Sequence, residues 1–384
     1  MSSGRSKKLF GLASLAAGTA AATGPTPEIA ISGLDAWAIR SSPEAVPRLV
    51  IALRTDAGLT GYGETSAGAD PASSVAEALR HANALVGKDA MASVAVRVSL
   101  SAAAPAIRGA VDIALLDVRG KIADAPVYDL LAGRTRDKAR AMASLQGSTE
   151  AELSQQLSAA RSSGFRAFSV PALLPDGTPT RGREFFANTE ATLRRLRQAG
   201  ATDLVLDCAG RTTAAEAAGL AARLETFHLM WMDEPTSPIS DSALEKISHE
   251  SVTPVGWGRF LTSSGQFQDL LRMQVIDVLR PDIGLHGISG VRQLASLAEA
   301  YYTAVAPFHR GGPIGTAAAL QVAASIPNFV VQEVAFSTDE AERRMHSAIA
   351  GESVPQVVDG FFTLPTAPGL GLEIDEAALQ EYAA

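Results

Sequence analysis

Two carboxylates stand at the ends of apolar runs, and their spacing is the first sign of chemistry in this sequence. Asp207 closes the run LVLD, and Glu234 lies in WMDEP, 27 residues further on. That distance is about one strand–helix unit of a (β/α)₈ barrel, in which about 250 residues form eight units. Acids at the carboxyl ends of neighbouring parallel strands would face each other across the barrel mouth, and their hard oxygens suit Mg²⁺. Judged singly, Asp207 would more often be a helix N-cap and Glu234 a solvated acid at a strand end.

The elements that would position these acids follow from the order of the apolar runs. From Ala143 onward, strand-like runs alternate with helical stretches rich in Ala, Leu, Arg and Glu. Strands buried on both faces indicate a parallel sheet, and about seven such units favour a closed barrel. Upstream, residues 55–58 read as a hairpin turn between two strands, and residues 71–134 have helical periodicity.

We therefore predict an α/β fold, a (β/α)₇β TIM-like barrel at residues 141–350. An α+β capping domain is expected at residues 28–140. The segment 351–384 has Gly and Pro punctuation, and we expect it to return to the capping domain.

Composition and charge exclude several classes of function. A chain of 384 residues with 47% hydrophobic and 19% charged residues can bury a large core. The net charge of −8, with no run of Lys and Arg beyond the first ten residues, argues against a nucleic-acid partner. The single Cys208 excludes an intramolecular disulfide and a cysteine-cluster metal site.

Residues 1–27 begin with basic residues and continue with small apolar ones. This pattern is typical of an export signal, and a disordered tail is the other interpretation. We expect a periplasmic or exported protein if the signal functions, and a cytoplasmic one otherwise. The stretch is too short and too rich in Gly, Thr and Ala to predict a membrane span.

Several short motifs occur in an order that resembles one protein family. They are TDAGLTGYGE, AVDIALLDVRGKIADAPVYDLLAG, GFRAFSV, LDCAGR, MDEP, RPDIG, GGPIGTAAALQVA, VQE and DGFFTLPTAPGLGLEID. Over residues 29–376 the chain resembles the mandelate racemase / muconate lactonizing branch of the enolase superfamily, and most of all galactonate-dehydratase-type sugar-acid dehydratases. The resemblance implies that a divalent metal, usually Mg²⁺, stabilises the enediolate formed when a Lys or His base removes the proton α to a carboxylate. It also implies a homo-oligomer, since members often form dimers or octamers.

The residues of that chemistry carry over unevenly. Asp207 and Glu234 match the first two metal ligands, but Arg259 stands where the resemblance implies the third. A guanidinium stays protonated and cannot ligate a cation. Ser169 occupies the position of a basic lysine, and Ala209 the position of an acidic histidine. The resemblance therefore predicts remnants of a metal site rather than a complete one.

The His–Asp pair that the resemblance implies also carries over only in part. Asp282 of RPDIG matches the aspartate of a His–Asp pair, whereas the histidine position falls on Phe308 and not on His309. A shift of one residue at a strand end turns the side chain to the other side. His309 reaches Asp282 only if the loop slips by a residue, and is otherwise a loop histidine without a special role. His286 is expected to be solvated, and Glu333 of VQE to bind substrate hydroxyls or cap a helix.

These substitutions predict that the positive charge of Arg259 replaces the charge of the metal ion. Two acids facing each other without a cation repel and raise each other's pKa, and the Arg259 guanidinium can bond one or both of them. We therefore expect a catalytically impaired protein without a cofactor, with Mg²⁺ only if the site still binds metal. Its ligand would be a small carboxylate or sugar acid that contacts Arg259, Glu333 and Ser169.

The alternative is an active sugar-acid dehydratase, a lyase, or a racemase with a rearranged site. In that case His309 with Asp282 would form the base, and Arg259 would hold the substrate carboxylate. A metal-independent lyase or epimerase is the third interpretation.

Overall fold

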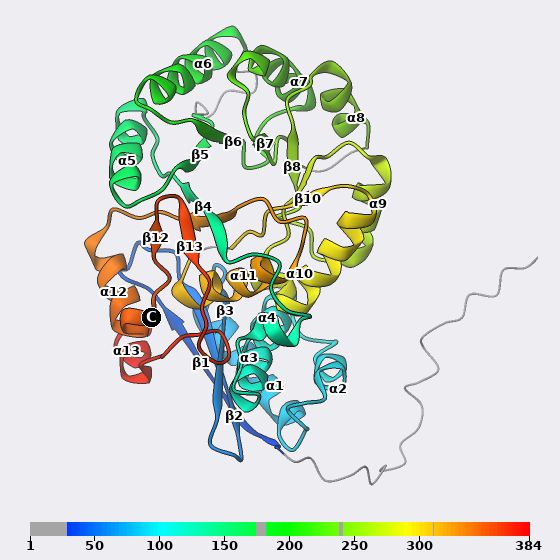
Figure 1. The fold of residues 1–384 in the computed structure, drawn as a ribbon, viewed down its shortest axis with the longest axis vertical. Coiled ribbons are helices and arrows are strands. Elements are labelled where there is room, and N and C mark those ends of the chain that lie inside the picture. Colours follow the sequence, from blue (N-terminus) through cyan, green and yellow to red (C-terminus); the bar gives the residue numbers. More distant parts are fainter. Residues whose placement is uncertain (1–28, 174–181, 238–240, 310) are drawn as a thin grey trace, which may run out of the picture.

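The computed structural model describes residues 29–173, 182–237, 241–309 and 311–384, arranged as a ring of parallel strands with a smaller α+β part packed against it (Figure 1). The export-signal-like stretch lies outside the described residues. Within the described ranges, no helix combines the length and the apolar character needed to cross a membrane.

The capping part is an antiparallel sheet covered by helices. Its strands β1 (Ile31–Ile39), β2 (Arg48–Thr55) and β3 (Thr60–Ser66) pair in chain order, and β2 and β3 form the predicted hairpin. A Cβ at Gly63 would lie 1.9 Å from the carbonyl oxygen of Ala110, so glycine lets a helix approach the sheet closely. The helices are α1 (Pro71–Leu85), α2 (Ser93–Ser99), α3 (Pro105–Ile122) and α4 (Val127–Leu130).

Eight parallel strands follow one another around the barrel. The first, β4, pairs with β5 on one side and with the last strand, β11, on the other. On the far side, Val305 of β10 bridges Phe329, just before β11. The predicted (β/α) barrel with a capping part is therefore confirmed. Its strands are β4 (Lys138–Ser144), β5 (Ala167–Pro171), β6 (Asp203–Asp207), β7 (Trp231–Asp233), β8 (Val255–Trp257), β9 (Val278–Leu279), β10 (Ala304–Val305) and β11 (Gln332–Ala335).

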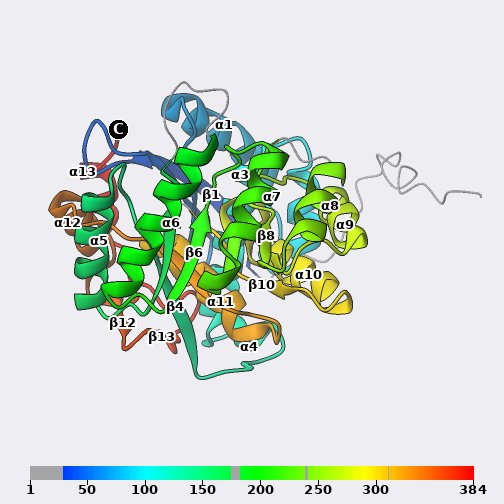
Figure 2. The same ribbon diagram turned by 90° about the horizontal axis from the view of Figure 1, so that it is seen from above.

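Helices follow the strands and cover the outside of the barrel, and Figure 2 shows α5 to α9 as neighbours in that outer layer. Local sequence sets where they begin. Thr149 and Glu152 form a capping box at α5, and Thr213 and Glu216 form another at α7. The helices are α5 (Glu150–Ser162), α6 (Gly182–Gln198), α7 (Ala214–Arg223), α8 (Asp241–Glu250), α9 (Ser264–Met273), α10 (Ile283–Ala300), α11 (Pro313–Ser325) and α12 (Glu340–Ala350).

The C-terminal segment contacts both parts of the molecule. Strand β13 (Phe361–Thr363) pairs with β12 (Val357–Val358) and runs antiparallel to the start of β4. Helix α13 (Glu376–Glu381) lies beside β1. Glu376 accepts a hydrogen bond of 2.7 Å from the Tyr62 hydroxyl and one of 2.8 Å from Arg54.

Candidate functional site

The barrel interior is built in layers, and the candidate site is the layer nearest the carboxyl ends of the strands. A buried apolar layer comes first, made of Met142, Ala167, Val205, Trp231, Val278, Ala306 and Val331. Alternate residues of a strand point the same way, so the residue two positions further along each strand enters the next layer. That layer, the mouth layer, consists of Ser144, Ser169, Asp207, Asp233, Arg280, Phe308 and Glu333.

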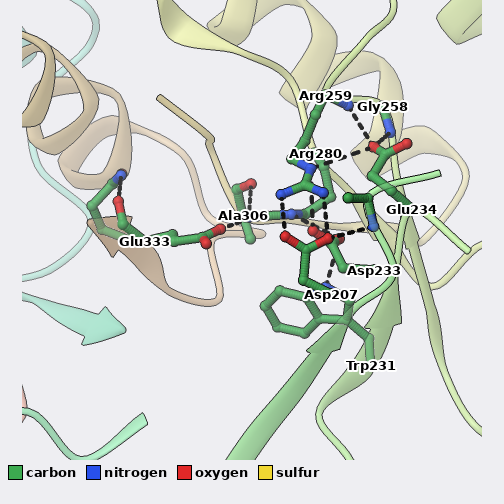
Figure 3. A network of polar contacts seen from close by, with 11 residues as sticks. Asp207, Trp231, Asp233, Glu234, Gly258, Arg259, Arg280, Ala306 and Glu333 are labelled. Carbon is green, nitrogen blue, oxygen red and sulfur yellow. Dashed lines mark hydrogen bonds and ion pairs between the residues drawn. The ribbon is translucent and has the colours of Figure 1, made fainter. Parts of the chain in front are cut away.

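Arg259 lies directly against Asp207 in the mouth (Figure 3). Its Nη1 donates to Oδ2 of Asp207 at 2.9 Å and its Nη2 to Oδ1 at 2.5 Å, so the pair is bidentate. The Arg259 side chain is 5% exposed and that of Asp207 is 17% exposed. Burial acts to lower the pKa of Arg259, but the carboxylates of Asp233 and Asp207 outweigh it, and the pKa is raised above its usual value. The guanidinium is therefore a fixed positive charge.

Glu234 is held mainly by backbone groups. Its Oε1 accepts hydrogen bonds of 2.7 Å from the N–H groups of both Gly258 and Arg259 (Figure 3). The Arg259 side chain is more distant, with Nε 3.9 Å from Oε1. Burial, followed by the negative charge of Asp233, raises the pKa of Glu234 to about 7. Near neutral pH this carboxyl is therefore close to the midpoint of its titration.

Asp233 and Arg280 belong to the site but were missed by the sequence reasoning. The Arg280 side chain is fully buried; its Nε donates to Oδ1 of Asp233 at 3.0 Å, and its Nη2 donates to Glu333 (Figure 3). The Trp231 indole N–H adds a bond of 2.8 Å to the same Asp233 oxygen. Counting two residues onward from each inward-facing apolar residue would have found both. Asp233 was overlooked beside Glu234 in MDEP, and Arg280 beside Asp282 in RPDIG.

Phe308 packs against the two arginines. Its ring centre lies 4.9 Å from the guanidinium carbon of Arg259 and 5.7 Å from that of Arg280, within the range of a cation–π contact. Phe308 also forms a backbone bridge with Asp282. An aromatic ring thus lies where the resemblance implied a histidine.

The structure gives His309 and Asp282 different hydrogen-bond partners. Buried His309 accepts from the Gly311 N–H at 2.9 Å through Nδ1, and its Nε2 lies 3.4 Å from Oγ1 of Thr316. Asp282 is the N-cap of α10 and accepts from the Gly284 N–H at 2.8 Å. Burial, helped by the charge of Arg48, lowers the pKa of His309 to about 3. An imidazole of such low basicity is a poor general base.

The remaining predicted residues are buried or partly buried; they are Ser169, Glu333 and His286. Ser169 is buried on β5, and Glu333 is paired with Arg280. The expectation that His286 is solvated was wrong. It is half-buried, its Nε2 is 2.8 Å from the Leu261 carbonyl oxygen, and its ring packs edge-on against Phe267.

These residues, as arranged, do not fit a divalent cation. Both Asp207 oxygens accept from Arg259, and Oε1 of Glu234 accepts from two N–H groups. An ion between the two acids would also lie beside a guanidinium, whose charge repels it. Three buried carboxylate oxygens, one each on Asp233, Glu234 and Glu333, have no hydrogen-bond partner among the described residues.

Comparisons with known proteins agree with this architecture. Residues 38–132 match the model of the mandelate racemase / muconate lactonizing enzyme N-terminal domain, and residues 152–378 match that of the enolase C-terminal domain-like family. A D-xylonate dehydratase from Haloferax volcanii is 27% identical over 367 residues, which cover 88% of this chain and 85% of that protein.

Solved structures show the same fold. A mandelate racemase/muconate lactonizing enzyme-like protein from Roseovarius sp. TM1035 superposes with a TM-score of 0.83 at 25% identity, covering 92% of this chain and 95% of that one. A mandelate racemase/muconate lactonizing enzyme from Jannaschia sp. CCS1 gives 0.83 at 24% identity, covering 92% and 98%. The order of the barrel strands, the capping sheet and both family matches agree, and the chain belongs to the mandelate racemase / muconate lactonizing enzyme branch of the enolase superfamily.

Proposed function

We propose that this protein binds a sugar acid or a related small carboxylate at the barrel mouth without the metal-dependent proton abstraction of its family. The observation that carries the proposal is the bidentate pair between Arg259 and Asp207. It places a permanently charged guanidinium between two acids that the resemblance identifies as metal ligands. An enediolate dianion needs more charge stabilisation than one guanidinium supplies.

The same guanidinium offers a way to hold a ligand. Asp207 is the more exposed partner of the pair, at 17%, so a ligand carboxylate can exchange with it on the Arg259 fork. Unpartnered oxygens of Glu234 and Glu333 can accept hydrogen bonds from hydroxyl groups. A carboxylate that carries several hydroxyls, as sugar acids do, matches both features, and the similarity to a D-xylonate dehydratase supports this class of ligand.

The alternative of an active dehydratase has less support. It needs His309 as a base paired with Asp282, whereas His309 contacts Gly311 and Thr316 and has a pKa lowered to about 3. Ser169 and Ala209 supply no group that takes up or gives a proton near neutral pH.

The test is calorimetric titration of the protein with sugar acids such as D-xylonate and D-gluconate, with and without Mg²⁺. We expect binding that does not depend on Mg²⁺, and a loss of about ten-fold or more in affinity in Arg259→Lys, which keeps the charge but lacks the fork. Arg272→Ala removes an exposed arginine of α9, paired with Asp269 on the surface, and should change affinity less than two-fold, or by about 0.4 kcal/mol.

A second variant tests the metal. Arg259→Glu should create a Mg²⁺ site without restoring turnover, because Ser169, Ala209 and Phe308 remain. Two results would overturn the proposal. One is Mg²⁺ binding to the unmodified protein tighter than about 1 mM. The other is a dehydrated product from any sugar acid, measured by mass spectrometry.

A further inference from the structure

A cavity of about 580 Å³ lies between the capping part and the barrel, away from the mouth layer. It is bounded by α2 and α3 on one side and by the starts of α9 and α10 on the other, and α10 packs against α3. None of the mouth-layer residues lines it. Its volume is in the usual range of small-molecule sites, about 300–1,000 Å³.

Two arginines give this cavity a positive wall. Nη1 of Arg108 donates to the carbonyl oxygens of Ser101 and Ala103, at 3.3 and 3.1 Å, which fixes its guanidinium beside the cavity. The Arg97 side chain also lines the cavity and donates to no other residue of the described ranges. In a chain with a net charge of −8, two guanidiniums on one cavity wall favour an anionic ligand.

A buried acid with an unsatisfied oxygen lines the same space. Asp112 is 3% exposed; its Oδ2 accepts from the Ser289 N–H at 2.8 Å, whereas its Oδ1 has no hydrogen-bond partner in the described part of the chain. Burial raises the pKa of the Asp112 carboxyl, although Arg97 and Arg119 act to lower it.

Apart from Ser101, the rest of the wall on the side of α2 and α3 is apolar, whereas the side of α9 and α10 adds the polar residues Thr262, Ser263, Ser264 and His286. Val94 and Val98, one helical turn apart on α2, are 64% and 65% exposed and line the cavity together with Val96, Leu100 and Leu115. Hydroxyl groups placed against these side chains would lose water without gaining partners. On the side of α2 and α3 the lining therefore favours an apolar ligand body over a sugar.

We propose that this cavity binds a small carboxylate with an aliphatic or aromatic body. Arg97 and Arg108 hold the carboxylate group, and Val94 and Val98 cover the body. This site is separate from the barrel mouth, so it does not rest on the function proposed for the mouth.

Octanoate is a suitable probe, titrated into the full chain by calorimetry. We expect binding in the micromolar to millimolar range, weakened about ten-fold or more by Arg97→Ala because a charge-assisted hydrogen bond is lost. Arg80→Ala removes an exposed arginine of α1 that does not line the cavity, and should leave the affinity within two-fold. Arg259→Lys should also leave it unchanged, which separates this site from the mouth. Thermal melting of each variant checks that it is folded.

Matched ligands test the stated chemistry. Octanamide has the apolar body without the charge, phosphate has charge without the body, and D-gluconate has a polar body, so each should bind at least ten-fold more weakly in this cavity. The proposal is overturned if octanamide binds as well as octanoate, or if octanoate does not bind up to about 10 mM. It is also overturned if light scattering shows a dimer that Val98→Asp dissociates, because a second copy would then cover the valines.

Discussion

At the scale of single residues, the described part of the barrel mouth contains four carboxyl groups and two guanidinium groups in a largely buried space. Arg280 engages Asp233 and Glu333, while Arg259 engages Asp207 and also lies 3.4 Å from Asp233. Among the described residues, Glu234 accepts hydrogen bonds from backbone N–H groups on one oxygen only. Burying a charge without a partner is costly, and protonation is the usual response. Glu234, whose pKa is raised to about 7, therefore changes its charge near neutral pH.

The first prediction concerns Glu234→Gln. The folded-state pKa of Glu234 is raised from 4.5 to about 7, so between these values the folded state holds a proton that the unfolded state releases. Stability of the unmodified protein should fall as pH rises from about 5 to 8, by on the order of 2 kcal/mol relative to the Gln variant. Urea unfolding of both proteins at several pH values measures the difference. A difference that stays flat across this range would contradict the assignment.

Part of this cluster could be predicted from the sequence and part could not. The motifs around Asp207, Glu234 and Arg259 predicted a guanidinium among acids, because motif order and side-chain charge are local information. The role of Asp233 and Arg280 depends on which strand residues point inward. The left-handed backbone at Glu234, with φ 44°, is equally invisible in a list of residues.

At the scale of elements, α10 is interrupted close to the capping part. Gly287 has φ 66° and ψ 178°, which breaks the helix, and the Ser289 N–H freed there donates to Asp112 of α3. A Cβ at Gly287 would lie 2.5 Å from the Asp112 carboxylate. The kink thus ties a barrel helix to a capping helix, and only glycine fits it.

The second prediction concerns Gly287→Ala. The substitution combines a left-handed backbone with a clash against Asp112, so we expect a loss of at least about 2 kcal/mol of unfolding free energy. Gly219→Ala is the matched control, because Gly219 is an ordinary residue of α7 whose added Cβ would only touch the Phe186 ring at 3.4 Å. The control should be neutral or stabilising by up to about 1 kcal/mol. Equal effects of the two substitutions in chemical denaturation would show that the kink is not required.

Elements were predicted well where local signals are strong. The hairpin turn and the alternation of strands and helices follow from short-range patterns. The break in α10 was not predicted, since a glycine within an apolar helical pattern does not reveal that a carboxylate from another helix lies beside it.

At the scale of the whole molecule, charged contacts join the capping part to the barrel. Arg48 of β2 donates to Glu342 of α12, and His346 lies 3.2 Å from the same carboxylate oxygen. Ser41 adds a hydrogen bond of 2.6 Å. Burial acts to raise the pKa of Glu342, but the hydrogen bond to His346 and the charge of Arg48 outweigh it and lower the pKa to about 2.

The third prediction concerns Glu342→Gln. Because the folded-state pKa is lowered, the stabilisation by Glu342 is present above about pH 4.5 and is lost as pH falls towards 2. We expect the variant to be less stable by about 2 kcal/mol at pH 7, with the deficit shrinking below pH 4. Glu340→Gln is the control, since Glu340 of the same helix forms an exposed pair with Arg344. A deficit as large at pH 2.5 as at pH 7 in thermal melts would contradict this.

The arrangement of the two parts was predicted through the family resemblance, whereas the residues that join them were not. Arg48, Glu342 and His346 belong to no motif, and they meet only because β2 and α12 are adjacent in space. The domain limits at residues 28, 141 and 351 remain predictions.

The hydrogen bonds between β1 and the C-terminal segment have a consequence for biosynthesis. The Arg40 N–H donates to the Tyr382 carbonyl oxygen at 3.1 Å, and the Ala384 N–H to that of Ala38 at 2.7 Å. Strand β1 is synthesised early and the segment that follows α13 is synthesised last. This edge of β1 therefore stays unpaired until the whole barrel has been synthesised. Nascent chains exposing such an edge are prone to association, and a chaperone that shields it during translation should raise the yield of native protein.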